Sequence, residues 1–315
     1  METVRVDLGD RSYDIQIGSR VLAELPRLMR GLKLGEDVFV LTSPTIRRHC
    51  GQALERVLAG ASFHLKVVET PDGEESKSLA TYERVAVELM AFDRKRQITV
   101  LALGGGVVGD LGGFVAATYK RGLGVDYVQV PTTLLAHVDS SVGGKVAINL
   151  RGVKNMLGAF YQPRLVFIEL DFLKTLPLRE LKSGLAEVIK YGVIFDRDFF
   201  EYVAANYERI LRLEPDCLSH IVKKSCEFKA ATVAADERDT RGQRALLNYG
   251  HTVGHAIEAA TSESIYTHGE AVALGMICAA RLGAELGACG PEVEQRIRSL
   301  LAAIGYETAI RGCTV

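Results

Sequence analysis

Residues 98–110 read ITVLALGGGVVGD, an apolar and partly β-branched run that ends in three consecutive glycines. This pattern predicts a buried strand over 98–106 and a helix over 109–119. The glycines spell GxGxxG, which between a strand and a helix lets a phosphate approach the positive helix N-terminus. However, the strand is not the first of its region, and no acid ends the next strand. The stretch favours a dinucleotide or other phosphate ligand over a tight turn, without being an ordinary Rossmann fingerprint.

The rest of the first half repeats the alternation of strand and helix. Compact apolar runs bounded by turn residues predict strands, and amphipathic runs between them predict helices. The expected strands are 3–7 and 12–17, a hairpin around Gly9-Asp10, then 38–43, 63–70, 126–133 and 164–170, and the expected helices are 19–30, 44–59 and 76–93. This order predicts an α/β fold in which a Rossmann-like parallel sheet is covered on both faces.

After residue 171 strand signals disappear and helical periodicity takes over. The expected helices are 178–194, 198–212, 215–235, 244–261, 268–287 and 291–303. We therefore expect two domains, an α/β domain over 1–171 and an all-α domain over 172–315, with the boundary near 171–177. A cleft between two such domains is a preferred place for a ligand.

Composition excludes several classes of protein. The formal net charge of -1 gives no reason to expect a nucleic acid or an anionic membrane surface as a partner. No apolar run of about 18 residues appears, and the N-terminus alternates and carries charge, so neither a membrane span nor a signal peptide is expected. Six scattered cysteines without paired spacing favour buried thiols in a reducing cytoplasm over disulfides.

The stretch RALLNYGHTVGHAIE over 244–258 is the first candidate for chemistry. In a helix, His251 and His255 would lie on one face, about one turn apart, where a metal or phosphate could meet both. Gly250 and Gly254 leave the backbone open to a ligand. The alternative is a tightly packed small-residue helix with one satisfied buried histidine.

Glu187, within GLAEVIKYG, is the second candidate. Its helix should bury it among apolar residues, which is costly unless the carboxylate is paired or holds a cation. Lys190, one turn on, is the simpler partner. The alternative joins Glu187 to His251 and His268, and two histidines with one carboxylate and an open position form a catalytic zinc set.

Polar loops supply the remaining candidates. Thr132 and Thr133 follow a strand, and the glycine-bearing segment from Asp139 to Lys145 comes next, with Lys154-Asn155 in a similar loop. Lysine neutralises phosphate, and Asn, Thr and Asp bond hydroxyl groups, so these loops suit anionic polyhydroxylated ligands. The alternative is an irregular surface loop. Glu74 and Lys77 alone would be a solvated charge pair at a helix N-terminus.

Taken together, the chain resembles the 3-dehydroquinate synthase family of sugar-phosphate cyclases. The resemblance runs from about residue 70 to 287, with the blocks in family order. The blocks are PTTLLAHVDSSVGGK, KNMLGAFYQP, LDFLKTLP, LAEVIKYG, LLNYGHTVGHAIE and HGEAVALGM.

The resemblance implies residue roles. It implies Zn²⁺ or Co²⁺ on Glu187, His251 and His268. It implies NAD at Glu74, Lys77, Gly105, Gly106, Asp110, Thr132, Thr133, Lys154 and Thr175. The sugar-phosphate substrate would meet Asp139, Lys145, Asn155, Lys190, Lys229, Arg244, Asn248 and His255. Arg121, in TYKRG, resembles an arginine that reaches the neighbouring subunit's site, which implies a homodimer.

The implied reaction converts 3-deoxy-D-arabino-heptulosonate 7-phosphate to 3-dehydroquinate and phosphate. NAD would take a hydride, phosphate would be eliminated, the hydride would return, and an intramolecular aldol step would close the carbocycle. His137 departs from the Gln or Met that is commoner in this block, and the family's later Asp-Lys-Lys block does not occur before Val315.

Three alternatives remain open at this point. A related cyclase of aminocyclitol or cyclitol synthesis would turn over glucose 6-phosphate or sedoheptulose 7-phosphate instead. A metal-dependent polyol dehydrogenase of similar build would accumulate NADH. A non-catalytic NAD-binding protein would bind the dinucleotide without turnover.

Overall fold

A computed structural model describes residues 1–121, 124–261 and 265–311 of the chain. Its central element is a seven-stranded sheet of order β1-β2-β9-β6-β5-β3-β4, parallel at every junction except the β1–β2 hairpin. The strands are β1 (Glu2–Val6), β2 (Tyr13–Gly18), β3 (Asp37–Thr42), β4 (His64–Glu69), β5 (Ile98–Gly104), β6 (Asp126–Pro131) and β9 (Leu165–Glu169). The predicted Rossmann-like parallel sheet is confirmed.

Helices cover both faces of this sheet, as continuous apolar strands require. β5 is buried along its whole length, and its two sets of side chains enter two different apolar clusters. The first-half helices are α1 (Leu25–Gly31), α2 (Pro44–Ile46), α3 (Gln52–Gly60), α4 (Leu79–Phe92) and α5 (Gly106–Thr118), with short 3-10 or π turns η1 (Gly9–Arg11), η2 (Leu22–Glu24), η3 (Arg47–Gly51), η4 (Glu74–Ser76) and η5 (Ala136–Ser140). α5 begins at Gly106, directly after the glycine turn.

One segment differs from prediction. Lys145, Lys154 and Asn155 do not lie in irregular loops, because β7 (Lys145–Leu150) and β8 (Val153–Phe160) form a separate antiparallel hairpin. Arg151 and Gly152 at its turn both have positive φ, 48° and 81°, as a two-residue hairpin turn requires. The exposed outer positions of β8 hid its strand character from the sequence pattern.

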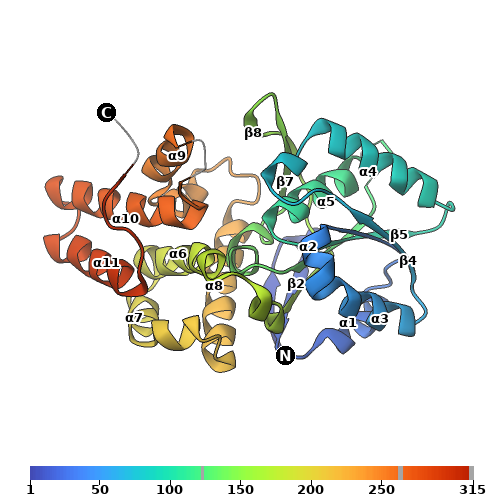
Figure 1. The fold of residues 1–315 in the computed structure, drawn as a ribbon, viewed down its shortest axis with the longest axis horizontal. Helices are drawn as coiled ribbons and strands as arrows, with labels where there is room; N and C mark the ends of the chain where they lie inside the picture. Colours follow the sequence, from blue (N-terminus) through green and yellow to red (C-terminus); the bar gives the residue numbers. More distant parts are fainter. Residues whose placement is uncertain (122–123, 262–264, 312–315) are drawn as a thin grey trace.

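The second half is helical (Figure 1). After η6 (Leu170–Thr175) come α6 (Leu178–Phe195), α7 (Arg197–Leu211), α8 (Pro215–Ala235), η7 (Gln243–Asn248), α9 (His251–Ala260), α10 (His268–Glu285) and α11 (Pro291–Ile304). None of the helices described is long and apolar enough to cross a bilayer. The predicted domain boundary remains a prediction, because one apolar core joins the β1–β2 hairpin, β9 and these helices.

The predicted single helix over 244–261 is wrong in its first third. Residues 243–248 form a 3-10 turn, and Gly250 adopts a left-handed conformation, φ 79°, immediately before α9 begins at His251. A side chain at Gly250 would also strike α10, since a Cβ there would lie 2.9 Å from the Met276 backbone nitrogen. The break turns the first residue of α9 toward α6 and α10.

Candidate functional site

Three helices bring Glu187, His251 and His268 together. Glu187 lies in the middle of α6 and is fully buried, whereas the two histidines begin α9 and α10. Nε2 of His251 is 3.4 Å from Glu187 Oε1, and Nε2 of His268 is 3.5 Å from the same oxygen. One potential ligand atom from each residue lies within 4.8 Å of the others.

Close helix packing fixes this arrangement. A Cβ on Gly275 of α10 would lie 1.9 Å from the carbonyl oxygen of Gly250, and one on Gly269 would lie 2.1 Å from that of Ser183 in α6. Only glycine permits such approaches. Thr267 and Glu270 form a reciprocal capping box that fixes the start of α10, and therefore the position of His268.

The donor set fits a divalent cation. Oε1 of Glu187 accepts no hydrogen bond from any residue the structure describes, although it is buried. A buried carboxylate oxygen without a donor is costly, and a cation held with the two imidazole nitrogens would remove that cost. Lys190 forms an ion pair with the other oxygen of Glu187, which confirms the simpler predicted partner and leaves Oε1 available for a cation.

Both histidines are oriented by a second contact. Nδ1 of His251 lies 3.2 Å from the Tyr249 carbonyl oxygen, and Nδ1 of His268 lies 3.4 Å from Glu258 Oε1. Burial alone would lower the pKa of His268, but the neighbouring carboxylates of Glu187 and Glu258 raise it to about 10. Burial lowers the pKa of His251. Without a cation, a proton on His268 neutralises the carboxylates around it.

The predicted cofactor residues follow the carboxyl ends of parallel strands. Gly105 and Gly106 follow β5, Thr132 and Thr133 follow the adjacent β6, and Thr175 follows β9. A Cβ on Gly105 would lie 3.1 Å from Thr133 Cγ2, so the two turns touch. Ligands of open α/β sheets bind at this edge.

Lys77 connects the other predicted cofactor residues, Glu74 and Asp110, near this edge. Its buried ammonium group lies 2.8 Å from Asp110 Oδ2 on α5 and donates to Asn155 Oδ1 on β8 at 2.5 Å. Glu74 accepts from Asn149 of β7 at 2.9 Å. Burial raises the pKa of Asp110 to about 6, against the lowering effect of Lys77. Glu74 and Lys77 are therefore part of a network, not a solvated pair.

A cavity of about 470 Å³ collects most of the predicted substrate residues. Its lining includes Asp110, Asp139, Lys145, Asn155, Lys229 and Arg244. These come from α5, η5, the β7–β8 hairpin, α8 and η7, so both halves of the chain contribute. Three cations in one cavity suit an anionic ligand.

Asp139 is the best-fixed acid of this cavity. Its Oδ1 accepts from Tyr191 at 2.8 Å and lies 2.6 Å from the Lys229 ammonium nitrogen. Burial would raise the pKa of Asp139, but the charges of Lys229 and Lys190 outweigh burial and lower it strongly. Burial lowers the pKa of Lys229 despite Asp139. Asp139 is thus held ionised.

The other predicted residues lie outside this lining. His255 and Asn248 are exposed, and the His255 ring centroid is 5.3 Å from that of His251. Lys190 is buried and donates to the Leu247 carbonyl at 2.7 Å. Thr175 hydrogen-bonds within its own turn, and Lys154 is exposed on β8. Arg121 is exposed after the C-terminal end of α5.

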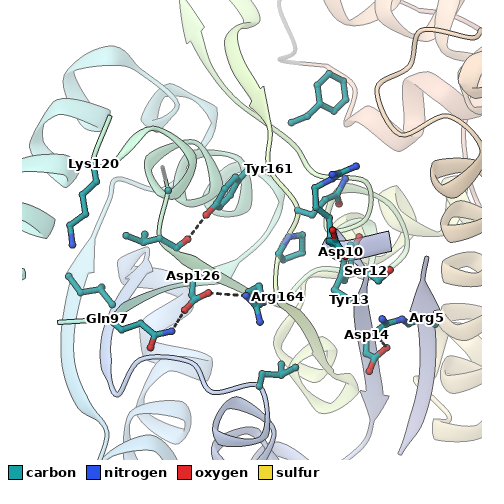
Figure 2. Close-up of a pocket in the computed structure, with 18 of the residues that line it drawn as sticks. Arg5, Asp10, Ser12, Tyr13, Asp14, Gln97, Lys120, Asp126, Tyr161 and Arg164 are labelled. Atoms are coloured by element: carbon teal, nitrogen blue, oxygen red, sulfur yellow. Dashed lines mark hydrogen bonds and ion pairs between the residues drawn. The ribbon is translucent and has the colours of Figure 1, made fainter. Parts of the chain in front are cut away.

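A larger cavity, about 600 Å³, lies elsewhere and contains none of the predicted residues. Figure 2 shows Asp126 in it, bonded to Gln97 at 2.6 Å and paired with Arg164 at 3.5 Å. Lys120 and Arg5 are likewise paired, with Asp93 and Asp14. Because none of the predicted ligand residues lines it, this cavity is the weaker candidate for the ligand site.

Sequence reasoning missed three polar residues of the site. Glu258 contacts His268, Tyr191 contacts Asp139, and Asp239 lies 2.6 Å from Lys145. The sequence spacing could have identified Glu258 as a site residue, because it follows His251 by seven residues and therefore lies on the same helix face.

Family models for two consecutive segments match the chain. The 3-dehydroquinate synthase N-terminal model covers residues 67–183, and the C-terminal model covers 184–315. The chain belongs to the 3-dehydroquinate synthase family. The 3-dehydroquinate synthase of Pelotomaculum thermopropionicum is 53% identical over 91% of this chain and 76% of its own length. That of Desulforamulus reducens is 50% identical over 98% of this chain and 86% of its own length.

Solved structures of other cyclases share this synthase-family fold. A 2-deoxy-scyllo-inosose synthase bound to carbaglucose-6-phosphate, NAD⁺ and Co²⁺ superposes with a TM-score of 0.89 at 27% identity, covering 100% of this chain and 84% of that chain. A 2-epi-5-epi-valiolone synthase from Streptomyces hygroscopicus with NAD⁺ and Zn²⁺ gives 0.86 at 26% identity, covering 98% and 84%.

Proposed function

We propose that this chain is a 3-dehydroquinate synthase, a carbon–oxygen lyase that forms 3-dehydroquinate and phosphate from 3-deoxy-D-arabino-heptulosonate 7-phosphate. One observation carries the proposal. The Glu187, His251 and His268 cluster and the cationic cavity lined by Lys145 and Arg244 occur together in a member of that family. The identity of 50–53% to two synthases supports this substrate over those of the cyclases at 26–27%.

Glu187, His251 and His268 would hold Zn²⁺ or Co²⁺, because they offer one oxygen and two nitrogens around a carboxylate that lacks a donor. When bound, the cation lowers the pKa of a substrate hydroxyl and NAD exchanges a hydride with the carbon that bears it. The buried Lys190 remains against Glu187, where its positive charge keeps this carboxylate ionised and available.

NAD would lie along the carboxyl edge of the sheet. Gly105 and Gly106 leave the N-terminus of α5 open to its pyrophosphate, and Thr132 and Thr133 border that turn. Glu74, Lys77 and Asp110 lie beside the turn, Thr175 follows β9 at the same edge, and Lys154 would approach from β8 of the separate hairpin. The carbaglucose-6-phosphate complex, which contains NAD⁺ and Co²⁺ in the same fold, supports this assignment.

The cavity residues would hold the substrate. Lys145 and Arg244 present positive charge to the phosphate, and Asn155 offers its amide group to a hydroxyl. Asn248, which lies outside the lining at the end of η7, would offer a second amide group. Asp139 stays ionised beside Lys229 and can accept a hydrogen bond from a substrate hydroxyl. His255, exposed and beside His251, is positioned to hold or move a proton on the substrate side.

Arg121 would complete the site of a second copy. It follows α5, whose thirteen residues begin at the glycine turn, so it lies about 20 Å away at the opposite edge of the sheet. It therefore lies far from the glycine turn of its own chain. Beside it, Tyr119 and the outer side of α4 form an apolar hollow with Leu79, Tyr82, Val87 and Met90. A homodimer that buries this surface would bring Arg121 of one protomer against the partner subunit.

A cytoplasmic location agrees with the cysteines. Cys50, Cys217, Cys226, Cys278 and Cys289 are all free thiols, and Cys313 lies outside the described residues. Burial raises the pKa of Cys226 to about 12, which keeps it protonated. Such thiols persist in a reducing compartment.

A phosphate-release assay tests the function. Metal-loaded protein with NAD should release phosphate from the heptulosonate and form one carbocyclic product, without accumulation of NADH. EDTA should abolish this release. Absence of phosphate release by the loaded protein overturns the proposal. Turnover of glucose 6-phosphate or sedoheptulose 7-phosphate in parallel reactions would assign the chain to another cyclase, and stoichiometric NADH would indicate a dehydrogenase.

A further inference from the structure

Glu258 shares a helix face with two histidines of the site. It follows His251 by seven residues and His255 by three on α9, so the three side chains project toward the same side. Its side chain is only 11% exposed, unlike most carboxylates. A carboxylate held there needs a partner, and Nδ1 of His268 lies 3.4 Å from its Oε1.

His268 is consequently held between two carboxylates. Its Nδ1 faces Glu258, and its Nε2 faces Glu187 Oε1 at 3.5 Å. An imidazole that donates its Nδ1 proton to a carboxylate keeps a lone pair on Nε2 and becomes a stronger ligand. His251 has only the neutral Tyr249 carbonyl oxygen in the equivalent position.

We propose that Glu258 is a positioning residue, which fixes the tautomer and orientation of His268 and so sets how tightly the site binds its cation. This inference rests on the metal site of the proposed function. Glu258 does not touch the cation in this arrangement. It acts through the ring, and its charge partly balances that of the ion across the imidazole.

A second arrangement of the same residues makes a different prediction. His255, Glu258 and His268 also bring three potential ligand atoms within 4.8 Å. A cation there would need the lone pair of His268 Nδ1, while the Glu187 site uses that of Nε2. A neutral imidazole has only one lone pair for a metal, so the two sites cannot both be filled without losing a further proton. The contact between Nδ1 and Glu258 favours the positioning role.

The test is metal binding to the purified chain. Zn²⁺ affinity and stoichiometry would be measured by competition with a chromophoric chelator, with visible absorption of the Co²⁺-loaded protein as a second readout. The variants are Glu258→Ala, Glu258→Gln and His251→Ala. Glu285→Gln is the matched control, because Glu285 lies on α10, is exposed and pairs with Arg281 one turn away on the same helix.

We expect one equivalent of Zn²⁺ in the unsubstituted chain. Glu258→Ala should weaken binding by about 10–100-fold, and Glu258→Gln, which keeps an acceptor oxygen but no charge, by less. Both should change the Co²⁺ spectrum, and Glu285→Gln should change neither readout. Circular dichroism would establish that each variant is folded. If Glu258→Ala does not fold, Glu258→Gln provides the test.

Failure of this inference is distinct from failure of the proposed function. If His251→Ala loses Zn²⁺ but both Glu258 variants bind with unchanged affinity, Glu258 has no positioning role. Two equivalents in the unsubstituted chain, of which Glu258→Ala loses one without weakening the other, would make Glu258 a ligand of a second ion and overturn the inference. If His251→Ala also binds normally, the metal site itself is wrong.

Discussion

The ammonium nitrogen of Lys229 on α8 lies 2.6 Å from Oδ1 of Asp139 in η5, the turn that follows β6 along the chain. Both groups are largely buried, with side-chain exposures of 7% and 30%. The pair therefore joins a helix of the second half to the strand edge of the first. It also leaves a fixed negative charge in the cavity.

Lys229→Met should lower the free energy of unfolding, because it leaves the Asp139 carboxylate buried without its cation. We expect a loss on the order of 2–3 kcal/mol. The double variant Lys229→Met/Asp139→Asn should recover at least half of this loss in urea unfolding. Lys224→Met, on the same helix but exposed, is the control and should change stability little. Equal losses in the single and double variants would contradict the pairing.

His251→Ala and His255→Ala should separate metal binding from turnover. His251 faces Glu187, whereas His255 is exposed on the next turn. His251→Ala should lose the cation and turnover. His255→Ala should keep one equivalent of metal and lose turnover by about 100-fold or more, as for a proton-transfer group. Elemental analysis and phosphate release measure the two effects, and complete metal loss in His255→Ala would refute this division.

His137 should make the fold sensitive to acid. It is fully buried, its Nε2 lies 3.0 Å from the Pro131 carbonyl oxygen, and burial lowers its pKa to about 4. The unfolded chain takes up the proton first as pH falls below about 6.5, so stability is lost between about 6.5 and 4. This amounts to about 3 kcal/mol.

His137→Gln should remove that slope, because glutamine does not titrate yet can donate to the same carbonyl. Urea unfolding of both proteins from pH 7 to pH 4 provides the comparison. The difference in stability between them should grow as pH falls. Parallel curves would mean that His137 does not carry the acid sensitivity.

Gly275→Ala should disrupt the metal site from a distance. Its Cβ would lie 1.9 Å from the Gly250 carbonyl oxygen, so α9 and α10 must separate and carry His251 away from His268. We expect weaker Zn²⁺ binding and a lower melting temperature. Gly283→Ala on the same helix meets only Cys289 Sγ, at 3.1 Å, and should cost far less. Unchanged metal affinity in Gly275→Ala would show that the helices can adjust.

Arg121 can be tested by mixing subunits. Arg121→Ala and Lys145→Met should each be inactive if a site needs Lys145 from its own chain and Arg121 from its partner. Co-refolding equal amounts would make half the dimers mixed, each with one intact site, so about a quarter of the full activity should return. No recovery, in mixtures that sedimentation shows to be dimeric, would place Arg121 outside the shared site.

The sheet and the unusual carboxylate at Glu187 could be predicted because their signals are local. Continuous apolar strands followed by glycine or polar turns indicate a parallel sheet, and the carboxylate at Glu187 stood out within an apolar helix. The cluster itself needed His251 and His268 from two other helices. Their association was chosen by chemical type and resemblance, since periodicity says nothing about which helices meet.

The misses arose where long-range contacts override local pattern. The β8 strand presents exposed side chains at most positions, so neither apolar alternation nor a buried run marked it. Gly250 could be accommodated in a helix, and only the backbone of α10 against it explains the break before His251. Glu258 resembled an ordinary surface acid until the fold buried it against His268.

The shared apolar core has a consequence for how such a protein can be divided. Val4, Ile15 and Ile168 of the sheet pack in the same cluster as Leu218 and Ile221 of α8. Cutting the chain after Thr175 would expose the apolar side chains of this core on both fragments. We expect neither fragment to be soluble alone. We therefore expect that the two halves cannot be exchanged independently. A chimera of two cyclases should fold only where the sheet side and the helical side of this core come from the same parent.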